Sequence, residues 1–155
     1  MRRVVLLCAL AALLAGCGSG APPEVTFAAG ATSVVAKPTQ YCDVKLQDCQ
    51  SDANAPVRLA VPAGTALKVT VPDEISSTPW QVVFTYRSAN GSRTDGRSPV
   101  LTPDQHQVYT LQLPAATDAL VTAEVQQYGP PPQANTETGE IEFPIRATWV
   151  LNSVG

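Results

Sequence analysis

Ser98, Asp104 and His106 carry the side chains that nucleophilic acyl transfer uses. In that chemistry a histidine activates the serine hydroxyl, and a carboxylate orients the histidine. His106 is the single histidine of the chain, and Asp104 precedes it by two positions, which on an extended backbone separates the two residues by about 6.6 Å. A base and its orienting carboxylate need a contact of about 2.6–3.2 Å. The spacing favours a solvated histidine in a loop. A Ser-His-Asp arrangement with Ser98 stays open only if the fold brings the three side chains together.

No other catalytic or metal-binding pattern occurs in the sequence. The chain lacks Gly-x-Ser-x-Gly, His-Glu-x-x-His, Gly-x-x-x-x-Gly-Lys and Gly-x-Gly-x-x-Gly, the patterns of hydrolase nucleophiles, zinc proteases and nucleotide-binding loops. Glu137, Glu140 and Glu142 do not have the aspartate-rich spacing of a calcium loop. We therefore expect no metal, no cofactor and no enzymatic activity.

The first residues have the organisation of an export signal. Arg2 and Arg3 precede Val4–Leu14, an unbroken apolar run of eleven residues. A helix of that length spans about 17 Å, roughly half of the ~30 Å hydrocarbon core of a bilayer, so it is too short to cross one. We expect residues 1–16 to be a cleaved signal peptide.

The end of this segment, Leu14-Ala15-Gly16-Cys17, resembles the lipobox of bacterial lipoproteins at every position. The resemblance implies that a diacylglycerol is attached to the Cys17 thiol and that the chain is cleaved before Cys17. Two acyl chains suffice for stable membrane anchoring. Residues 17–23 would form a tether that reaches at most about 25 Å, followed by one domain over residues 24–155. The alternative is a soluble secreted protein whose Cys17 is coincidental.

The charge balance limits the partners of the exported chain. The sequence has 10 basic and 13 acidic residues, and loss of Arg2 and Arg3 changes the net charge from −3 to −5. A protein that binds nucleic acid by neutralising phosphates needs a basic surface, so that class is excluded. No basic cluster adjoins the tether, so the lipid alone would hold the protein at the cell membrane.

The remaining cysteines predict a disulfide. Cys8 would leave with the signal and Cys17 would carry lipid, so Cys42 and Cys49 are the pair on the oxidising side of the membrane. Their spacing differs from Cys-x-x-Cys, which redox-active pairs use. Zinc sites need further cysteine or histidine ligands nearby, and only His106 remains. A structural disulfide is favoured over the metal and redox alternatives.

Apolar and polar residues alternate along most of the exported chain. The last alternating stretch places apolar residues on one face, at positions 141, 143, 145, 147, 149 and 151, and short stretches of this kind recur between 14 prolines and 10 glycines. This pattern indicates half-buried antiparallel strands and predicts an immunoglobulin-like β-sandwich of about seven to nine strands, without a convincing helix. A small closed barrel is the alternative. Pro144 interrupts the last stretch, so we expect an edge strand or a bulge there.

The order of several segments resembles a family of actinobacterial lipoproteins that is catalogued as a domain of unknown function, DUF2771. The resemblance covers most of the exported chain and depends on Tyr41–Val44 with Cys49, Thr78–Val83, Asp95–Val100, Val125–Gly129 and Ala147–Trp149. None of these segments is a functional motif. The resemblance therefore implies a source and a location and assigns no site.

Three features are candidate binding surfaces. Arg87, Arg93 and Arg97 surround two Gly-containing turns, and this local positive charge suits lipid headgroups or an acidic partner; a solvated hairpin tip explains the same residues. Tyr128 lies on the outward side of its strand with Glu124 and would form a contact surface or be simply exposed. The proline-rich segment 129–139 is a recognition loop or a connection.

These observations favour a lipid-anchored, non-enzymatic binding or structural module of the cell envelope, with an envelope protein as its partner. A carrier or receptor for a small envelope molecule is the alternative, and it would need a sizeable apolar pocket between the sheets. An envelope hydrolase would need Ser98, Asp104 and His106 to converge.

Overall fold

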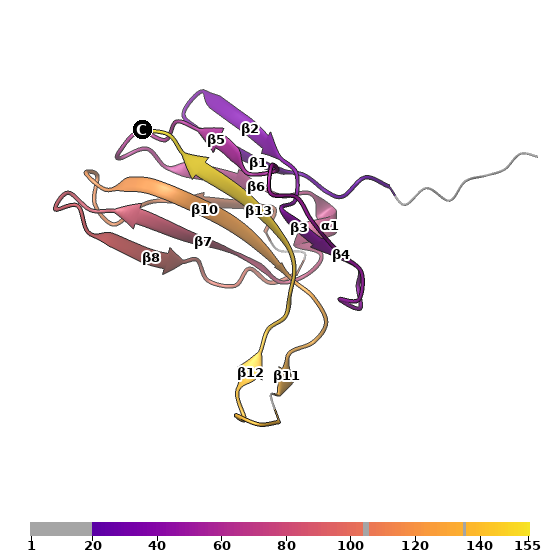
Figure 1. The fold of residues 1–155 in the computed structure, drawn as a ribbon. Coiled ribbons are helices and arrows are strands. Elements are labelled where there is room, and N and C mark those ends of the chain that lie inside the picture. The colour runs from indigo at the N-terminus through magenta and orange to yellow at the C-terminus, as the bar shows by residue number, and fades with distance from the viewer. Residues whose placement is uncertain (1–19, 104–105, 135) are drawn as a thin grey trace, which may run out of the picture.

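Two sheets of mainly antiparallel strands pack face to face and enclose a common apolar core (Figure 1). The structure is a computed structural model that describes residues 20–103, 106–134 and 136–155. The predicted signal peptide, Cys17 and Asp104 lie outside these residues. The all-β sandwich expected from the alternation is confirmed, and the sheets do not close into the alternative barrel.

The smaller sheet has the strand order β2-β1-β6-β9, and all of its pairs are antiparallel. Its strands are β1 (Val25–Ala29), β2 (Thr32–Ala36), β6 (Leu67–Thr70) and β9 (Val108–Leu111). Alternate side chains of β1 are buried, as the sequence predicts for a strand with one face on the core.

The larger sheet has the order β4-β3-β13-β10-β7-β8. Its strands are β3 (Gln40–Cys42), β4 (Cys49–Ser51), β7 (Trp80–Arg87), β8 (Arg93–Arg97), β10 (Ala119–Tyr128) and β13 (Ile145–Ser153). A further strand, β5 (Val57–Leu59), pairs in parallel with β13. The two sheets together hold eleven described strands, more than the seven to nine expected, because β3, β4 and β5 have only three residues each and are too short to show an alternating pattern.

The core is built from aligned rows of side chains across the long strands. Val82, Val125 and Trp149 are paired in register across β7, β10 and β13, and none of the three is exposed. Trp80 is also fully buried, and its indole N–H donates to the carbonyl oxygen of His106 at 3.2 Å. Both tryptophans bury a large apolar area and still have a partner for the indole nitrogen, as buried tryptophans require.

A short helix, α1 (Asp73–Ser76), follows β6, although no convincing helix was expected from the sequence. It is a single turn that begins after Pro72, has two acidic residues in its first turn, and buries Ile75 against the core. One turn is too short for a 3.6-residue periodicity to be visible. Among the described residues, no helix is both long and apolar enough to cross a membrane.

A two-stranded hairpin extends away from the sandwich between β10 and β13 (Figure 1). Its strands are β11 (Gln133–Ala134) and β12 (Ile141–Glu142), and we call residues 130–144 the projecting hairpin. The backbone N–H of Gly129 donates to the carbonyl oxygen of Pro144 at 2.8 Å and closes its base.

The projecting hairpin corrects the prediction for the last strand. Ile141 and Phe143 were expected on the core face, yet they are 65% and 58% exposed. Strand β13 begins only at Ile145, after Pro144, and it lies between β10 and the strands β3 and β5. The expectation of an edge strand at Pro144 is therefore wrong, whereas the alternative of a bulge agrees with the register shift between Gln127 and Tyr128 in the pairing of β10 with β13.

Candidate functional site

The structure does not bring Ser98 and His106 together as a nucleophile and its base. Ser98 is only 4% exposed, and its hydroxyl accepts from the N–H of Val82 at 2.9 Å and donates to the carbonyl oxygen of Pro99 at 2.7 Å. His106 is exposed, and its carbonyl oxygen receives the indole N–H of Trp80. No hydrogen bond joins Ser98 to His106, and Asp104 lies outside the described residues. The Ser98 hydroxyl thus connects β7 to the segment after β8.

The disulfide predicted between Cys42 and Cys49 is present. The two cysteines are directly opposite each other on β3 and β4, so the bond closes a short loop at one end of the sheet. Within this loop the Asp43 carboxylate accepts the N–H of Gln47 at 2.7 Å, and this hydrogen bond lowers the pKa of Asp43. Arg146 holds the loop to the sandwich by donating to the carbonyl oxygen of Cys42 at 3.1 Å. The pair is a structural cross-link.

The three arginines that the sequence singled out share the outer face of the larger sheet. Arg87 and Arg93 are directly opposite each other on β7 and β8, and Arg97 lies four residues further along β8, opposite Val83. Residues that are directly opposite in a sheet point to the same side. No hydrogen bond or ion pair links these guanidinium groups to any other residue that the structure describes.

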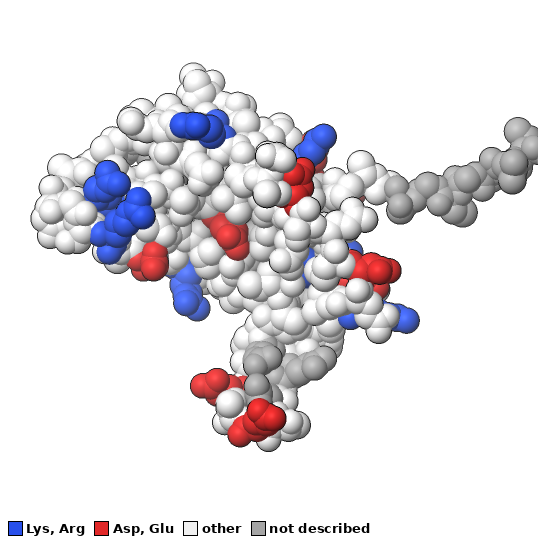
Figure 2. All heavy atoms as spheres, viewed as in Figure 1, with Lys and Arg blue, Asp and Glu red and all other residues white. Residues whose placement is uncertain are grey.

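Sequence reasoning missed a fourth arginine on this face. Arg58 on β5 is in register with Asn152, which is in turn aligned with Thr122 and Thr85. Nothing in the sequence indicates that β5 pairs in parallel with β13, because the pairing involves only three residues. We call Arg58, Arg87, Arg93 and Arg97 the arginine face (Figure 2); all four are exposed.

A shallow groove of about 450 Å³ crosses this outer face, and we call it the sheet groove. Two carboxylates lie in it, and both accept hydrogen bonds: Asp95 from the hydroxyl of Thr85 at 2.6 Å, and Glu124 from the amide of Gln126 at 2.8 Å. The amide of Gln81 donates in turn to Gln126 at 3.1 Å. The groove is lined by Val83, Phe84, Thr85, Asp95, Gly96, Arg97, Thr122, Glu124 and Val150.

Tyr128 belongs to a second groove, at the base of the projecting hairpin. The sequence placed Tyr128 outside the core; the structure leaves it half-buried, with its ring edge-on to Phe143 at 5.9 Å between centroids. Burial raises the pKa of the Tyr128 phenol, and the nearby Arg97 guanidinium acts in the opposite direction.

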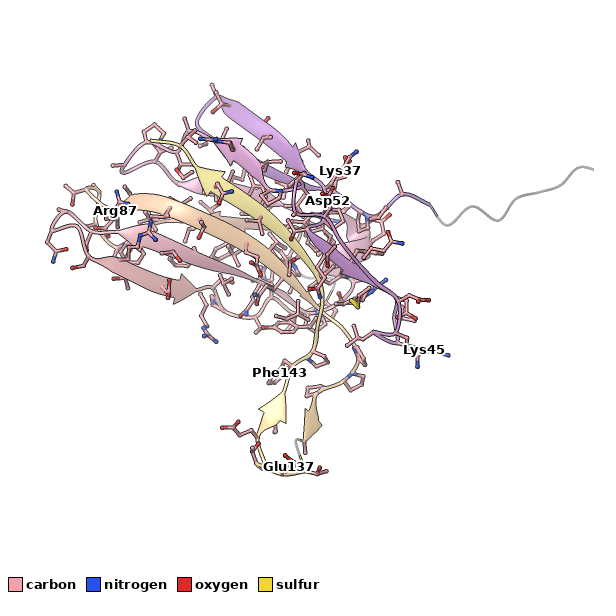
Figure 3. All side chains as sticks on the ribbon, in the orientation of Figure 1. Lys37, Lys45, Asp52, Arg87, Glu137 and Phe143 are labelled. Carbon is pink, nitrogen blue, oxygen red and sulfur yellow. A yellow bond between two sulfur atoms is a disulfide. The ribbon has the colours of Figure 1, made fainter. Side chains whose placement is uncertain are left out.

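We call this second site the proline–aromatic groove; it has a volume of about 390 Å³. Four separate segments of the chain form it, so sequence reasoning singled out Tyr128 and the proline-rich segment 129–139 but not Pro79 or Val100. Its walls are mostly rigid and apolar, and they consist of Pro79, Val100, Thr102, Tyr128, Gly129, Pro130, Pro131, Pro132, Phe143 and Pro144. Such walls suit an apolar side chain, and the Tyr128 phenol is the one titratable group among the lining residues. Figure 3 places Phe143 at the base of the projecting hairpin and Glu137 at its tip.

The acidic residues do not form a metal site in the part of the chain that the structure describes. No group of three or more histidine, cysteine, aspartate or glutamate side chains there is arranged to hold an ion.

Comparison with known proteins gives one match. A family model described as Protein of unknown function (DUF2771) matches residues 19–154. No curated protein and no solved structure gives a significant match. The match covers the whole sandwich and the projecting hairpin.

Proposed function

We propose that this chain, which belongs to the family described as Protein of unknown function (DUF2771), is a non-enzymatic binding module of the actinobacterial cell envelope. In this proposal a diacylglycerol on Cys17 holds the domain at the outer face of the cell membrane, where it docks another envelope protein. The observation that carries the docking function is the proline–aromatic groove, which lies open beside the exposed ring of Phe143.

The start of the domain supports a position close to the membrane. The fully buried Trp149 donates its indole N–H to the carbonyl oxygen of Pro23 at 2.9 Å. Residues from Pro23 onward are therefore tied to the sandwich. Only residues 17–22 remain as a tether, and six residues extend at most about 20 Å. A partner bound by this domain would be held near the lipid surface.

The nature of the proline–aromatic groove supports a protein partner. Proline rings have fixed backbone angles, and the rings of Tyr128 and Phe143 are held edge-on to each other. A pre-organised apolar groove loses little conformational entropy when it binds, which favours affinity. Phe143 is 58% exposed, and large exposed apolar side chains beside a groove are typical of interaction sites.

The two alternative functions have less support. A carrier would need an apolar cavity between the sheets, whereas Phe27, Trp80 and Trp149 fill that space with no exposed surface, and the proline–aromatic groove and the sheet groove both lie outside it. A hydrolase would need an activated nucleophile, and the Ser98 hydroxyl is engaged by Val82 and Pro99.

The proposal is tested by photo-crosslinking in live cells. A photoreactive residue replaces Phe143 in the full chain, and its matched control replaces Val108, another exposed apolar residue, on the smaller sheet. We expect a discrete, reproducible crosslinked envelope protein from position 143 and none from position 108, because only the first adjoins the proline–aromatic groove.

Two results would contradict the proposal. One is the same set of crosslinked products from positions 143 and 108, which would indicate random collisions. The other is turnover of a defined envelope substrate by the purified chain, which would make it an enzyme.

A further inference from the structure

We propose that copies of this chain assemble head to tail, with the projecting hairpin of one copy lying in the sheet groove and against the arginine face of the next copy. This inference goes beyond the docking function proposed above, since the receiving surface is the sheet groove with the arginine face and the partner is a second copy of this chain.

The receiving surface is unusually basic for this protein. Four of the eight basic residues that follow residue 16 lie on the arginine face, in a chain whose net charge is −3. Asp95 and Glu124 are the acidic residues that line the sheet groove, and each already accepts a hydrogen bond from a neighbour. The four arginines outnumber these two carboxylates, so the face has a local excess of positive charge that a partner can neutralise. In Figure 2 basic side chains lie over β7 and β8, and others lie apart from them near β5.

The projecting hairpin has the opposite character. The sequence contains no lysine or arginine between Arg97 and Arg146, and the hairpin carries Glu137 and Glu140 near its tip. Ile141 in the same hairpin is 65% exposed. In Figure 3 the tip with Glu137 points away from the sandwich and lies at a distance from Arg87. The hairpin tip and the Arg87 end of the arginine face thus do not contact each other within one copy.

The two surfaces also match in apolar contacts and in width. Val83 and Val150 are apolar residues of the sheet groove, and Arg97 lies at its edge. The row from Arg97 through Val83 and Glu124 to Val150 crosses four strands, a distance of about 14 Å at ~4.8 Å per strand. A two-stranded ribbon fits this width, so Ile141 would cover Val83 while Glu137 and Glu140 meet the arginines.

A contact of this kind joins two different surfaces of the same chain. Such a heterologous contact leaves one free hairpin and one free groove at the ends, so it builds an open chain of copies unless a ring closes. Copies anchored in one membrane would meet at a high effective concentration, which lets a weak contact operate.

The test uses charge reversal and mixing of full chains. Copies in neutral detergent carry a donor or an acceptor dye at the C-terminus, and energy transfer reports association. One variant reverses the receiving surface (Arg87→Glu, Arg93→Glu and Arg97→Glu), and a second reverses the hairpin (Glu137→Arg and Glu140→Arg). We expect unaltered copies to associate more weakly as salt rises, and each variant alone to associate at least about tenfold more weakly than the unaltered chain.

Mixing the two variants gives the decisive measurement. Each hairpin then meets an oppositely charged sheet face on the other variant, so the mixture should recover the energy transfer that both variants lack alone. A control with Glu24→Arg and Asp48→Arg changes the net charge as much as the hairpin variant does, and it should associate like the unaltered chain.

The proposal is overturned if the unaltered chain shows no energy transfer, if the two variants fail to associate when mixed, or if the control loses association to the same degree as the hairpin variant. Circular dichroism of every variant establishes that each one is folded.

Discussion

Gly96 shows how a single side chain limits the larger sheet. It lies opposite Phe84 in the pairing of β7 with β8, and a Cβ atom added to it would lie 2.5 Å from the Cζ atom of the Phe84 ring. We expect Gly96→Ala to lower the free energy of unfolding by about 1–2 kcal/mol, since overpacking forces neighbours to move. Chemical denaturation measures this change.

A second substitution tests the cause. Phe84→Leu removes the obstructing ring atoms. In a chain that carries Phe84→Leu, Gly96→Ala should therefore lower the free energy of unfolding by less than it does in the natural chain, and the two effects should not be additive. Gly20→Ala, at a position with no atom within 4 Å of the added Cβ, should leave stability unchanged. Additive effects at Gly96 and Phe84 would show that ring contact is not the reason.

Ionisation of the Tyr128 phenol makes the stability of the fold depend on pH in the alkaline range. Burial raises the pKa of its phenol above the ordinary value near 10, while the Arg97 guanidinium lowers it. As the pH rises, the unfolded chain loses the phenol proton before the folded chain does. The contribution of Tyr128 to the free energy of unfolding is therefore complete below about pH 10 and is lost as the pH rises through the folded-state pKa. Tyr128→Phe should therefore remove part of the alkaline loss of stability.

Arg97→Gln offers a direct measurement of the same interaction. Without the guanidinium, the phenolate is less stabilised, so the pKa of Tyr128 should rise further. Nuclear magnetic resonance of a chain labelled at tyrosine Cζ follows this titration. A pKa that stays the same or falls in Arg97→Gln would show that the two side chains do not interact.

Among the structural elements, the disulfide loop between β3 and β4 is the simplest to test. Closing a loop of eight residues removes entropy from the unfolded chain that corresponds to about 2.5 kcal/mol. We expect Cys42→Ala with Cys49→Ala to lower the free energy of unfolding by about this amount while the sandwich still folds, because the core residues of β10 and β13 are untouched. Equal stability of the oxidised and reduced natural chain would contradict this.

The elements also show what the sequence could predict. Long strands with one face on the core, such as β7 and β13, reveal themselves by alternation because every second side chain must be apolar. The same alternation was misleading at Ile141 and Phe143, since it continues past Pro144 although the chain has left the sheet. Whether Ile141 and Phe143 are buried depends on whether another part of the fold covers them, and a local sequence pattern does not contain that information.

The candidate surfaces were predictable only in part for a similar reason. Arg87, Arg93 and Arg97 are close in sequence and in space because one hairpin joins them. Arg58 reaches the same face through a parallel pairing from a distant segment. The proline–aromatic groove combines Pro79, Val100 and the segment around Tyr128, so its lining depends on tertiary contacts that no local pattern encodes.

At the scale of the whole molecule, the bond from Trp149 to Pro23 links the core to the membrane anchor that we propose. Strand β13 thereby fixes the point at which the proposed N-terminal tether joins the domain. The sandwich would sit within about 20 Å of Cys17, so both the proline–aromatic groove and the arginine face would act on partners close to the lipid surface.

This position depends on the acyl chains, and Cys17→Ala tests it. Each buried methylene contributes about 0.8 kcal/mol to membrane binding, and no basic cluster beside the tether would replace the lost chains. We expect Cys17→Ala to move the protein from the membrane fraction to the soluble exported fraction. Cys8→Ala is the matched control, because Cys8 lies in the segment that we propose is removed, and it should leave the protein in the membrane fraction. A Cys17→Ala chain that still sediments with membranes would contradict lipid anchoring, and with it the argument that the domain works at the membrane surface.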